Sequence, residues 1–197
     1  MKKSISYYDA NATNFIKTTR NVDFTSVQKR FLKKLPAHAY ILDFGCGSGR
    51  DTKYFLDKGY RVDAVDGSIE LCKYASSYTG IKVRNMFFQE LDTEDTYHGI
   101  WACASILHVP QVELPDILSK MIRALKTKGI IYASFKYGDF EGEQNGRYFT
   151  NMTEMSFKEL LRDVSELSIL EEWVSVDIRS GREDEKWLNV ILQKKEK

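Results

Sequence analysis

The sequence predicts an α/β fold: one doubly wound, mostly parallel sheet of seven strands with helices on both faces, in three layers. Three observations lead to this prediction. Strand-like apolar runs alternate with helix-like apolar stripes along the chain. The first strand-like run ends in a glycine-rich turn followed by a helix-forming stretch. No helix-length segment separates the last two strand-like runs, so we expect the last strand to run antiparallel to its neighbours.

The expected helices follow from apolar residues that recur every three or four positions. They cover residues 25–35, 50–58, 69–78, 113–126 and 153–166. Thr25 and Gln28 have the spacing of a capping box and predict the start of the first of these helices. Pro36 ends it.

The expected strands are short apolar runs bounded by turn residues. They cover residues 39–44, 61–65, 81–87, 99–104, 129–135, 168–176 and 187–193. The length of 197 residues suits a single domain. Within that domain, residues 1–36 form an N-terminal cap of arm and helix, and residues 136–152 form an insertion over the sheet edge.

The most informative segment is the turn after the first strand, Asp43-Phe44-Gly45-Cys46-Gly47-Ser48-Gly49. Glycine lacks Cβ, so it adopts positive φ and lets backbone N–H groups approach a ligand. The helix that begins at Arg50 places a positive N-terminus at the same turn. Strand, glycine turn and helix predict a site for a nucleoside-containing cofactor.

Two details favour S-adenosylmethionine over a dinucleotide. The third glycine, Gly49, comes one residue earlier than in the dinucleotide pattern G-x-G-x-x-G. Asp43 would repel a pyrophosphate, whereas it suits a ligand with a sulfonium and an ammonium group. Asp66 ends the second strand, where an acid binds ribose hydroxyls in both cofactor classes. Asp66 therefore supports an adenosyl ligand without choosing between the two.

Over residues 39–135 the chain resembles the class I S-adenosylmethionine-dependent methyltransferases, which have a Rossmann-like fold. The resemblance rests on residues 43–49, 65–68 and 101–108. Within that class the chain is most similar to the small bacterial enzymes of the broad type 11 group, which includes tellurite-resistance methyltransferases. The resemblance implies an enzyme, with S-adenosylmethionine as its cofactor.

The resemblance also implies roles for individual residues. The glycine turn would hold the methionine portion and Asp66 the ribose, while Gln89 stands where the family often has Asp beside the adenine. The full expected cofactor set is Asp43, Gly45, Gly47, Gly49, Asp66, Gly67, Phe88, Gln89, Ala102 and Cys103.

His108 is the candidate acid–base residue, at a strand-to-helix junction over the expected methyl position. An imidazole with its ordinary pKa titrates near neutrality and could act as a general base. In the alternative interpretation His108 hydrogen-bonds the backbone and shapes the pocket. The widely spaced thiols Cys46, Cys72 and Cys103 indicate neither a disulfide framework nor a metal site, so we expect no metal.

Two segments outside the alternating core should determine the choice of acceptor. They are the arm Tyr7–Phe15 and the insertion Lys136–Phe149, which follows the fifth strand. The expected acceptor-binding residues are Tyr8, Arg147 and Tyr148, with the planar guanidinium of Arg147 reading an anionic or oxygen-rich group.

Two alternatives for the insertion remain open at this stage. It could be an irregular surface loop with Phe140 and Tyr148 packed into the core. Arg147 could pair with Glu141 or Glu143 and only order the loop.

The net charge of +1 gives no reason to expect nucleic acid as the main partner. No apolar run approaches membrane length, and the cysteine usage favours a reducing cytoplasm. We therefore expect a monomeric or homodimeric methyltransferase that acts on a small-molecule acceptor by in-line displacement. The alternatives are a methyltransferase for tRNA or another nucleic acid, and a non-catalytic subunit that binds S-adenosylmethionine.

Overall fold

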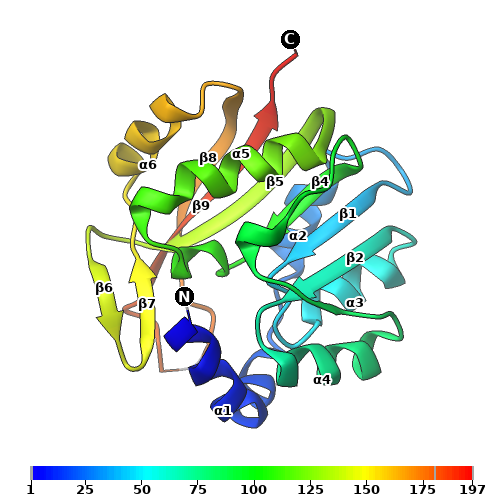
Figure 1. The fold of residues 1–197 in the computed structure, drawn as a ribbon, viewed down its shortest axis with the longest axis vertical. Coiled ribbons are helices and arrows are strands. Elements are labelled where there is room, and N and C mark those ends of the chain that lie inside the picture. Colours follow the sequence, from blue (N-terminus) through cyan, green and yellow to red (C-terminus); the bar gives the residue numbers. More distant parts are fainter. Residues whose placement is uncertain (1, 180, 197) are drawn as a thin grey trace.

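The computed structural model describes residues 2–179 and 181–196. Its main sheet has seven strands in the order β3-β2-β1-β4-β5-β9-β8 (Figure 1). Their bounds are β1 Tyr40–Phe44, β2 Arg61–Asp66, β3 Arg84–Asn85, β4 Tyr97–Ala102, β5 Leu125–Lys136, β8 Leu167–Val176 and β9 Lys186–Lys194. Only β9 runs against its neighbours β5 and β8. The expected mostly parallel sheet with an antiparallel last strand is confirmed.

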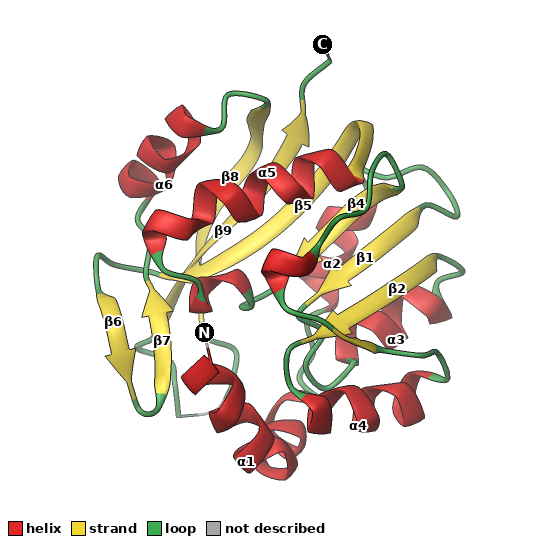
Figure 2. Cartoon of the chain, in the orientation of Figure 1, coloured by secondary structure: helices red, strands yellow, loops and turns green. Residues whose placement is uncertain are grey.

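Helices cover both faces of the sheet (Figure 2). They are α1 Lys2–Thr19, α2 Thr25–Leu32, α3 Arg50–Asp57, α4 Ile69–Thr79, α5 Leu114–Ala124 and α6 Glu154–Leu160. Phe31 of α2 and Phe55 of α3 pack around Trp101 on one face. The apolar stripe of α5 and Phe157 of α6 pack on the other face, so the sheet lies between two apolar layers. None of the helices in the described residues is long and apolar enough to cross a bilayer.

Several elements differ in length from the expectation. Strand β3 has only two residues instead of the expected 81–87, because the chain leaves the sheet after Asn85 and turns toward the ligand-binding edge. Helix α6 ends at Leu160 and continues as the 3₁₀ turn Leu161–Asp163. Both departures lie at the end of an element, where sequence patterns are least informative.

The predicted capping box at Thr25 and Gln28 is wrong. The N-cap of α2 is Phe24, and the carboxylate of Asp23, not the side chain of Thr25 or Gln28, accepts the first backbone N–H of the helix, that of Thr25, at 2.9 Å. The amide side chain of Gln28 is buried and donates to Asp51 at 2.6 Å. A buried carboxylate without hydrogen-bond donors costs more free energy than an exposed helix terminus without a side-chain acceptor, since water can satisfy the terminus.

The expected arm ahead of the first helix is itself part of a helix, the 18-residue α1. Figure 1 shows α1 across the carboxyl ends of the central strands, beside α4 and the hairpin. Buried Ser4, Ala12 and Thr19 lie on the face that the helical period directs inward. Helix α1 is held against the rest of the fold by hydrogen bonds and small apolar contacts, because its sequence carries few large aliphatic residues.

The insertion after β5 forms a β-hairpin instead of a loop. Strands β6 Glu141–Gln144 and β7 Arg147–Thr150 pair antiparallel through the two-residue turn Asn145-Gly146. Both turn residues have positive φ, 50° and 76°, as a type I′ turn requires. Phe140 is 42% exposed, so the alternative in which it packs into the core is wrong.

Candidate functional site

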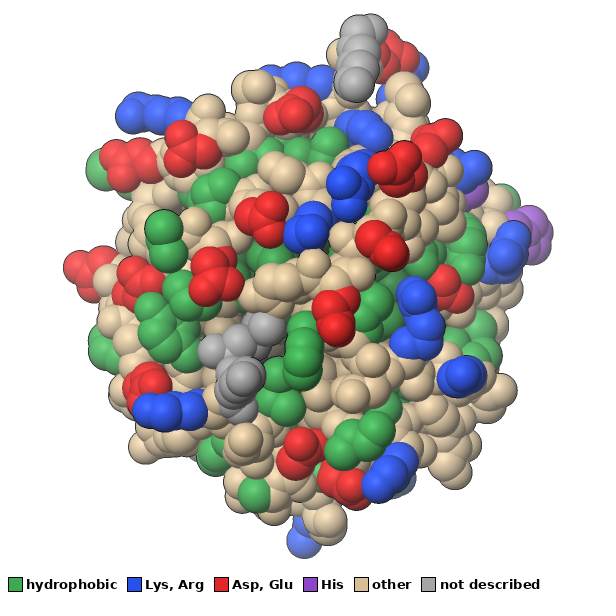
Figure 3. All heavy atoms as spheres, viewed as in Figure 1, with side chains coloured by type: hydrophobic (Ala, Val, Ile, Leu, Met, Phe, Trp, Pro, Cys, Tyr) green, Lys and Arg blue, Asp and Glu red, His purple; other side chains and the backbone are tan. Residues whose placement is uncertain are grey.

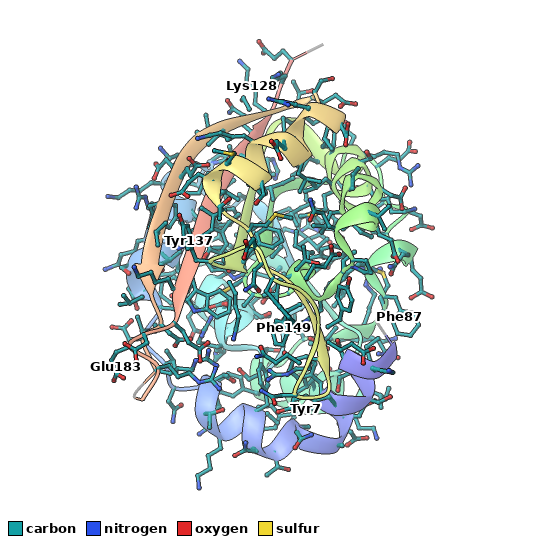
Figure 4. All side chains as sticks on the ribbon, turned by 90° about the vertical axis from the view of Figure 1, so that its left-hand side faces the viewer. Tyr7, Phe87, Lys128, Tyr137, Phe149 and Glu183 are labelled. Atoms are coloured by element: carbon teal, nitrogen blue, oxygen red, sulfur yellow. The ribbon has the colours of Figure 1, made fainter. Side chains whose placement is uncertain are left out.

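A cavity of about 490 Å³ opens at the carboxyl ends of the sheet strands. Its floor is the glycine turn after β1 together with the ends of β2, β4 and β5, the edge at which open α/β sheets bind ligands. Its roof comprises α1, Arg147 and Phe149 of β7, and the segment after β8. Figure 4 shows α1, with Tyr7 labelled, meeting the hairpin that carries Phe149.

The glycine turn has the geometry that the sequence predicted. A Cβ on Gly45 (φ 89°) would lie 2.5 Å from the Cβ of Ser105, so only glycine fits there. Gly45 and Gly47 line the cavity. Gly49 begins α3 and packs against Ala75, away from the cavity wall, so its role is in the local packing.

Asp66 lies in the cavity wall at the end of β2, as expected. Its carboxylate accepts the backbone N–H groups of Gly47 and Ser68, each at 2.8 Å. Burial nevertheless raises the pKa of Asp66 to about 6. The neighbouring Gly67, also in the wall, lies against Ile5 of α1. Roof and floor therefore meet beside Asp66.

Asp43 is 2% exposed and lies behind the turn instead of in the cavity wall. Thr52 donates to its carboxyl group at 2.5 Å. Burial and the nearby charge of Asp51 raise the pKa of Asp43 to about 8. Direct contact between Asp43 and a cationic ligand, which the sequence suggested, does not follow from this placement.

Asp51 is the buried acid of the site that the sequence analysis missed. It accepts from Gln28, from Arg50 at 2.8 Å and from the indole of Trp101 at 2.9 Å. The charge and donors of Arg50 keep the pKa of Asp51 low despite burial. Asp51 therefore carries the charge of this acidic pair, while Asp43 is neutral below pH 8.

The end of the cavity next to β3 is lined by Met86, Phe87 and Phe88, and the ring of Phe88 lies 4.7 Å from that of Phe44. Gln89 lies outside the wall and donates to Glu113 at 3.0 Å. Phe88 and Gln89 belong to the expected cofactor set, and of these two only Phe88 faces the cavity. Met86 and Phe87 were missed because the expected third strand ran through them.

Directly after β4 the cavity wall is formed by Cys103, Ala104 and Ser105. Ala102, the last residue of β4, is fully buried and does not face the cavity. Of the two neighbours in the expected cofactor set, only Cys103 therefore lines the ligand space.

His108 is buried and bonded at both ring nitrogens. Nδ1 lies 2.6 Å from the carbonyl oxygen of Tyr148, and Nε2 lies 2.8 Å from the Tyr8 hydroxyl. Burial lowers the pKa of His108 to about 4, so the expected titration near neutrality is wrong. The alternative in which His108 bonds the backbone and shapes the pocket describes the observed contacts.

Arg147 lies in the cavity wall, with its guanidinium carbon 4.5 Å from the centre of the Tyr7 ring and 5.1 Å from that of Phe149. The suggested pairing with an acid of the hairpin is not found among the described residues. Glu143 pairs with Lys3, and Glu141 accepts from the hydroxyl of Tyr148.

Of the three expected acceptor-binding residues, Tyr8 and Arg147 line the cavity. The side chain of Tyr148 turns outward to Glu141, and only its backbone carbonyl serves the site. Side chains of β8 and β9 complete the wall next to β5, and none of them was among the expected site residues. They are Trp173, Ser175, Trp187 and Asn189.

Two further cations in this wall have acidic partners. Lys136 pairs with Glu185 at 2.9 Å, and Arg179 pairs with Asp177. Within the described ranges, 2–179 and 181–196, Arg147 has no acid at ion-pair distance. No group of three or more possible metal ligands occurs in the same ranges.

Comparison with known proteins agrees with this geometry. Residues 41–129 match a family model described as a methyltransferase domain. An uncharacterized methyltransferase of Staphylococcus carnosus is 25% identical over 160 residues, which are 78% of this chain and 77% of that protein.

Among solved structures, 1,6-didemethyltoxoflavin-N1-methyltransferase of Burkholderia thailandensis, with bound 1,6-didemethyltoxoflavin and S-adenosylhomocysteine, superposes with a TM-score of 0.80. It is 22% identical, and the match covers 99% of this chain and 88% of that one. A TehB-like S-adenosylmethionine-dependent methyltransferase of Corynebacterium glutamicum gives 0.72 at 21% identity, covering 94% and 99%.

Proposed function

We propose that this chain is a class I S-adenosylmethionine-dependent methyltransferase and that it methylates a small molecule bound in the cavity beneath α1. One observation carries the proposal. A single cavity continues from Asp66, at the expected ribose position, to Arg147 under the roof. A volume of about 490 Å³ is in the range of small-molecule sites.

The residues of the floor fit the cofactor. Asp66 offers carboxylate oxygens to ribose hydroxyls, and the bare backbone at Gly45 and Gly47 leaves room for the methionine portion. Phe87 and Phe88 offer apolar surface to the adenine. The space beyond Cys103, toward Arg147, remains for the acceptor.

S-adenosylmethionine supplies a methyl group already activated by its sulfonium. The protein must hold the acceptor's nucleophilic atom close to that methyl and in line with the bond that breaks. Positioning of this kind contributes roughly 7–11 kcal/mol to lowering a barrier. Helix α1 and the hairpin keep water out, and Arg147 and Tyr8 orient the acceptor.

A strong general base is not part of the proposed mechanism. His108 has a pKa of about 4, so it takes up a proton poorly at neutral pH. The nucleophilic atom therefore reacts through a free electron pair, and any proton that it still carries after the methyl transfer is lost to bulk solvent when the product is released. His108 then acts as a positioning residue for Tyr8.

The small-molecule acceptor is favoured over the two alternatives. The structural neighbour from Burkholderia thailandensis has bound 1,6-didemethyltoxoflavin and S-adenosylhomocysteine, whereas a nucleic-acid enzyme needs a basic surface. On the face in Figure 3, basic and acidic side chains are interspersed. A non-catalytic subunit would bind the cofactor without methylating any acceptor. A cytoplasmic location and a monomeric or homodimeric state stay predictions.

The test combines binding and turnover. Calorimetry should give a micromolar dissociation constant for S-adenosylhomocysteine and no measurable binding of NAD. Labelled S-adenosylmethionine should then transfer its methyl to a pool of small metabolites and not to bulk tRNA. Transfer to tRNA alone would contradict the proposed acceptor class, and NAD binding without S-adenosylhomocysteine binding would falsify the cofactor assignment.

A further inference from the structure

The roof and the floor of the cavity are joined by a chain of hydrogen bonds. It runs from the Tyr8 hydroxyl to His108 Nε2 at 2.8 Å, and from His108 Nδ1 to the carbonyl oxygen of Tyr148 at 2.6 Å. The first residue is on α1, the second follows β4, and the last is on β7. The Arg147 guanidinium lies beside Tyr8, with its carbon 5.9 Å from the centre of the Tyr8 ring.

The carbonyl end determines the direction of these hydrogen bonds. A backbone carbonyl only accepts hydrogen bonds, so His108 must carry its proton on Nδ1 and accept at Nε2. The Tyr8 hydroxyl must then donate its single hydrogen to His108, since the unprotonated Nε2 can only accept.

The direction of these hydrogen bonds determines which donor and acceptor groups a ligand meets in the cavity. Tyr8 has used its hydrogen on His108, so toward the cavity its oxygen can only accept. Arg147 can only donate, and its Nε is buried without a hydrogen-bond partner. An obligate acceptor and an obligate donor thus lie next to each other in the wall.

The surroundings of this pair favour a flat ligand. The ring centres of Tyr7 and Phe15 lie 5.6 and 5.1 Å from that of Tyr8, and the ring centre of Phe149 lies 5.1 Å from the guanidinium carbon of Arg147. Aromatic faces and a planar guanidinium contact a planar ring over its full area.

We infer that the methyl acceptor is a planar ring compound with a hydrogen-bond donor beside an acceptor oxygen, such as a lactam N–H next to its carbonyl. The donor binds the Tyr8 oxygen and the carbonyl binds Arg147. His108 is the positioning residue that sets the direction. This inference rests on the proposed function, because it names the acceptor class of the same site.

The experiment measures binding of two probes to the protein saturated with S-adenosylhomocysteine. Quinolin-2-one has the N–H beside its carbonyl, and its N-methyl derivative lacks the donor. One hydrogen bond contributes about 0.5–1.5 kcal/mol, so the unmethylated probe should bind about three- to tenfold more tightly. His108→Phe frees the Tyr8 hydrogen, and the ratio should fall toward one.

Tyr8→Phe should also bring the ratio of the two probe affinities close to one, because it removes the oxygen that accepts the probe's N–H. Tyr137→Phe is the matched control: the Tyr137 hydroxyl bonds Glu154, and the residue is outside the cavity wall. It should keep the wild-type ratio. All variants should retain micromolar affinity for S-adenosylhomocysteine, which also reports that they are folded.

The outcomes separate this inference from the proposed function. Equal binding of both probes, or binding of neither at millimolar concentration, overturns the inference while S-adenosylhomocysteine binding persists. An unchanged probe ratio in a folded His108→Phe variant overturns it too, since the direction would not depend on His108. Loss of S-adenosylhomocysteine binding in the wild-type protein would instead overturn the proposed function.

Discussion

Asp9 on α1 accepts a hydrogen bond from the Ser68 hydroxyl, with 2.6 Å between the two oxygens. Ser68 follows the ribose-binding candidate Asp66 and caps α4. The bond therefore attaches the roof of the cavity directly to the side on which the cofactor is expected.

We expect Asp9→Ala to speed the release of S-adenosylhomocysteine by about three- to tenfold, the worth of one hydrogen bond. Stopped-flow displacement measures this rate. Asp9→Asn keeps an acceptor oxygen and should retain most of the wild-type rate. Identical release from all three proteins would mean that α1 does not hold the cofactor.

Asp66→Ala should weaken binding of S-adenosylmethionine by at least ~1.5 kcal/mol, the lower value for hydrogen bonds to a charged group. That loss is more than tenfold in the dissociation constant. Calorimetry checks it, with Asp92→Ala as an exposed control. Unchanged affinity in a folded Asp66→Ala protein would remove this residue from the site.

Asp43 should make the free protein less stable as the pH rises. Its pKa is about 8 in the folded protein and about 4 in an unfolded chain, so the folded state holds an extra proton between these values. Stability from this group is complete below pH 4 and is lost progressively up to pH 8. Asp66, with a pKa near 6, contributes only to the lower part of this window.

Asp43→Asn mimics the neutral acid and should flatten the slope between pH 6 and 8. The slope has a ceiling of about 1.4 kcal/mol per pH unit for one group. Urea unfolding at pH 6, 7 and 8 gives the comparison. Parallel slopes for the wild-type and variant proteins would show that Asp43 is already ionised at pH 6.

His108 should remain neutral from pH 8 down to pH 5, because its pKa is about 4. Nitrogen-15 spectra of the imidazole should show the Nδ1–H tautomer throughout this range. The signal that disappears in His108→Gln identifies the residue. A midpoint near 6.5 would restore the general-base interpretation.

Arg147→Lys should weaken acceptor binding more than cofactor binding, because an ammonium cannot reproduce the planar fork of donors. With quinolin-2-one as the probe, we expect at least a fivefold loss of affinity, about 1 kcal/mol. Binding of S-adenosylhomocysteine should change less than twofold. Equal losses for both ligands would indicate that Arg147 only orders the hairpin.

The sheet and the cofactor half of the site could be predicted because their signals are local. The glycines at 45 and 47 and the acid at 66 follow directly from strand ends, where chain geometry determines what faces a ligand. Gln89 and Ala102 were misplaced within the same region, since a shift of one residue in a strand or turn reverses the side chain.

The rest of the site could not be predicted, because it depends on contacts between distant parts of the chain. The contact between Gln28 and Asp51 has no local sequence signal, because the two side chains come from separate helices and meet only in the folded chain. The lowered pKa of His108 likewise comes from burial under α1 and β7. The hairpin was the exception: Asn145-Gly146 is a recognised turn signal, and its use would have predicted both strands.

The two-residue turn also limits how this protein can change its acceptor. Successive residues of a strand face opposite sides, so Arg147 faces the cavity while Tyr148 faces outward. One residue added to the turn would exchange the two, whereas two added residues would preserve the alternation. Insertions that preserve the acceptor site should therefore come in steps of two residues, and they leave the glycine-turn side of the cavity unchanged.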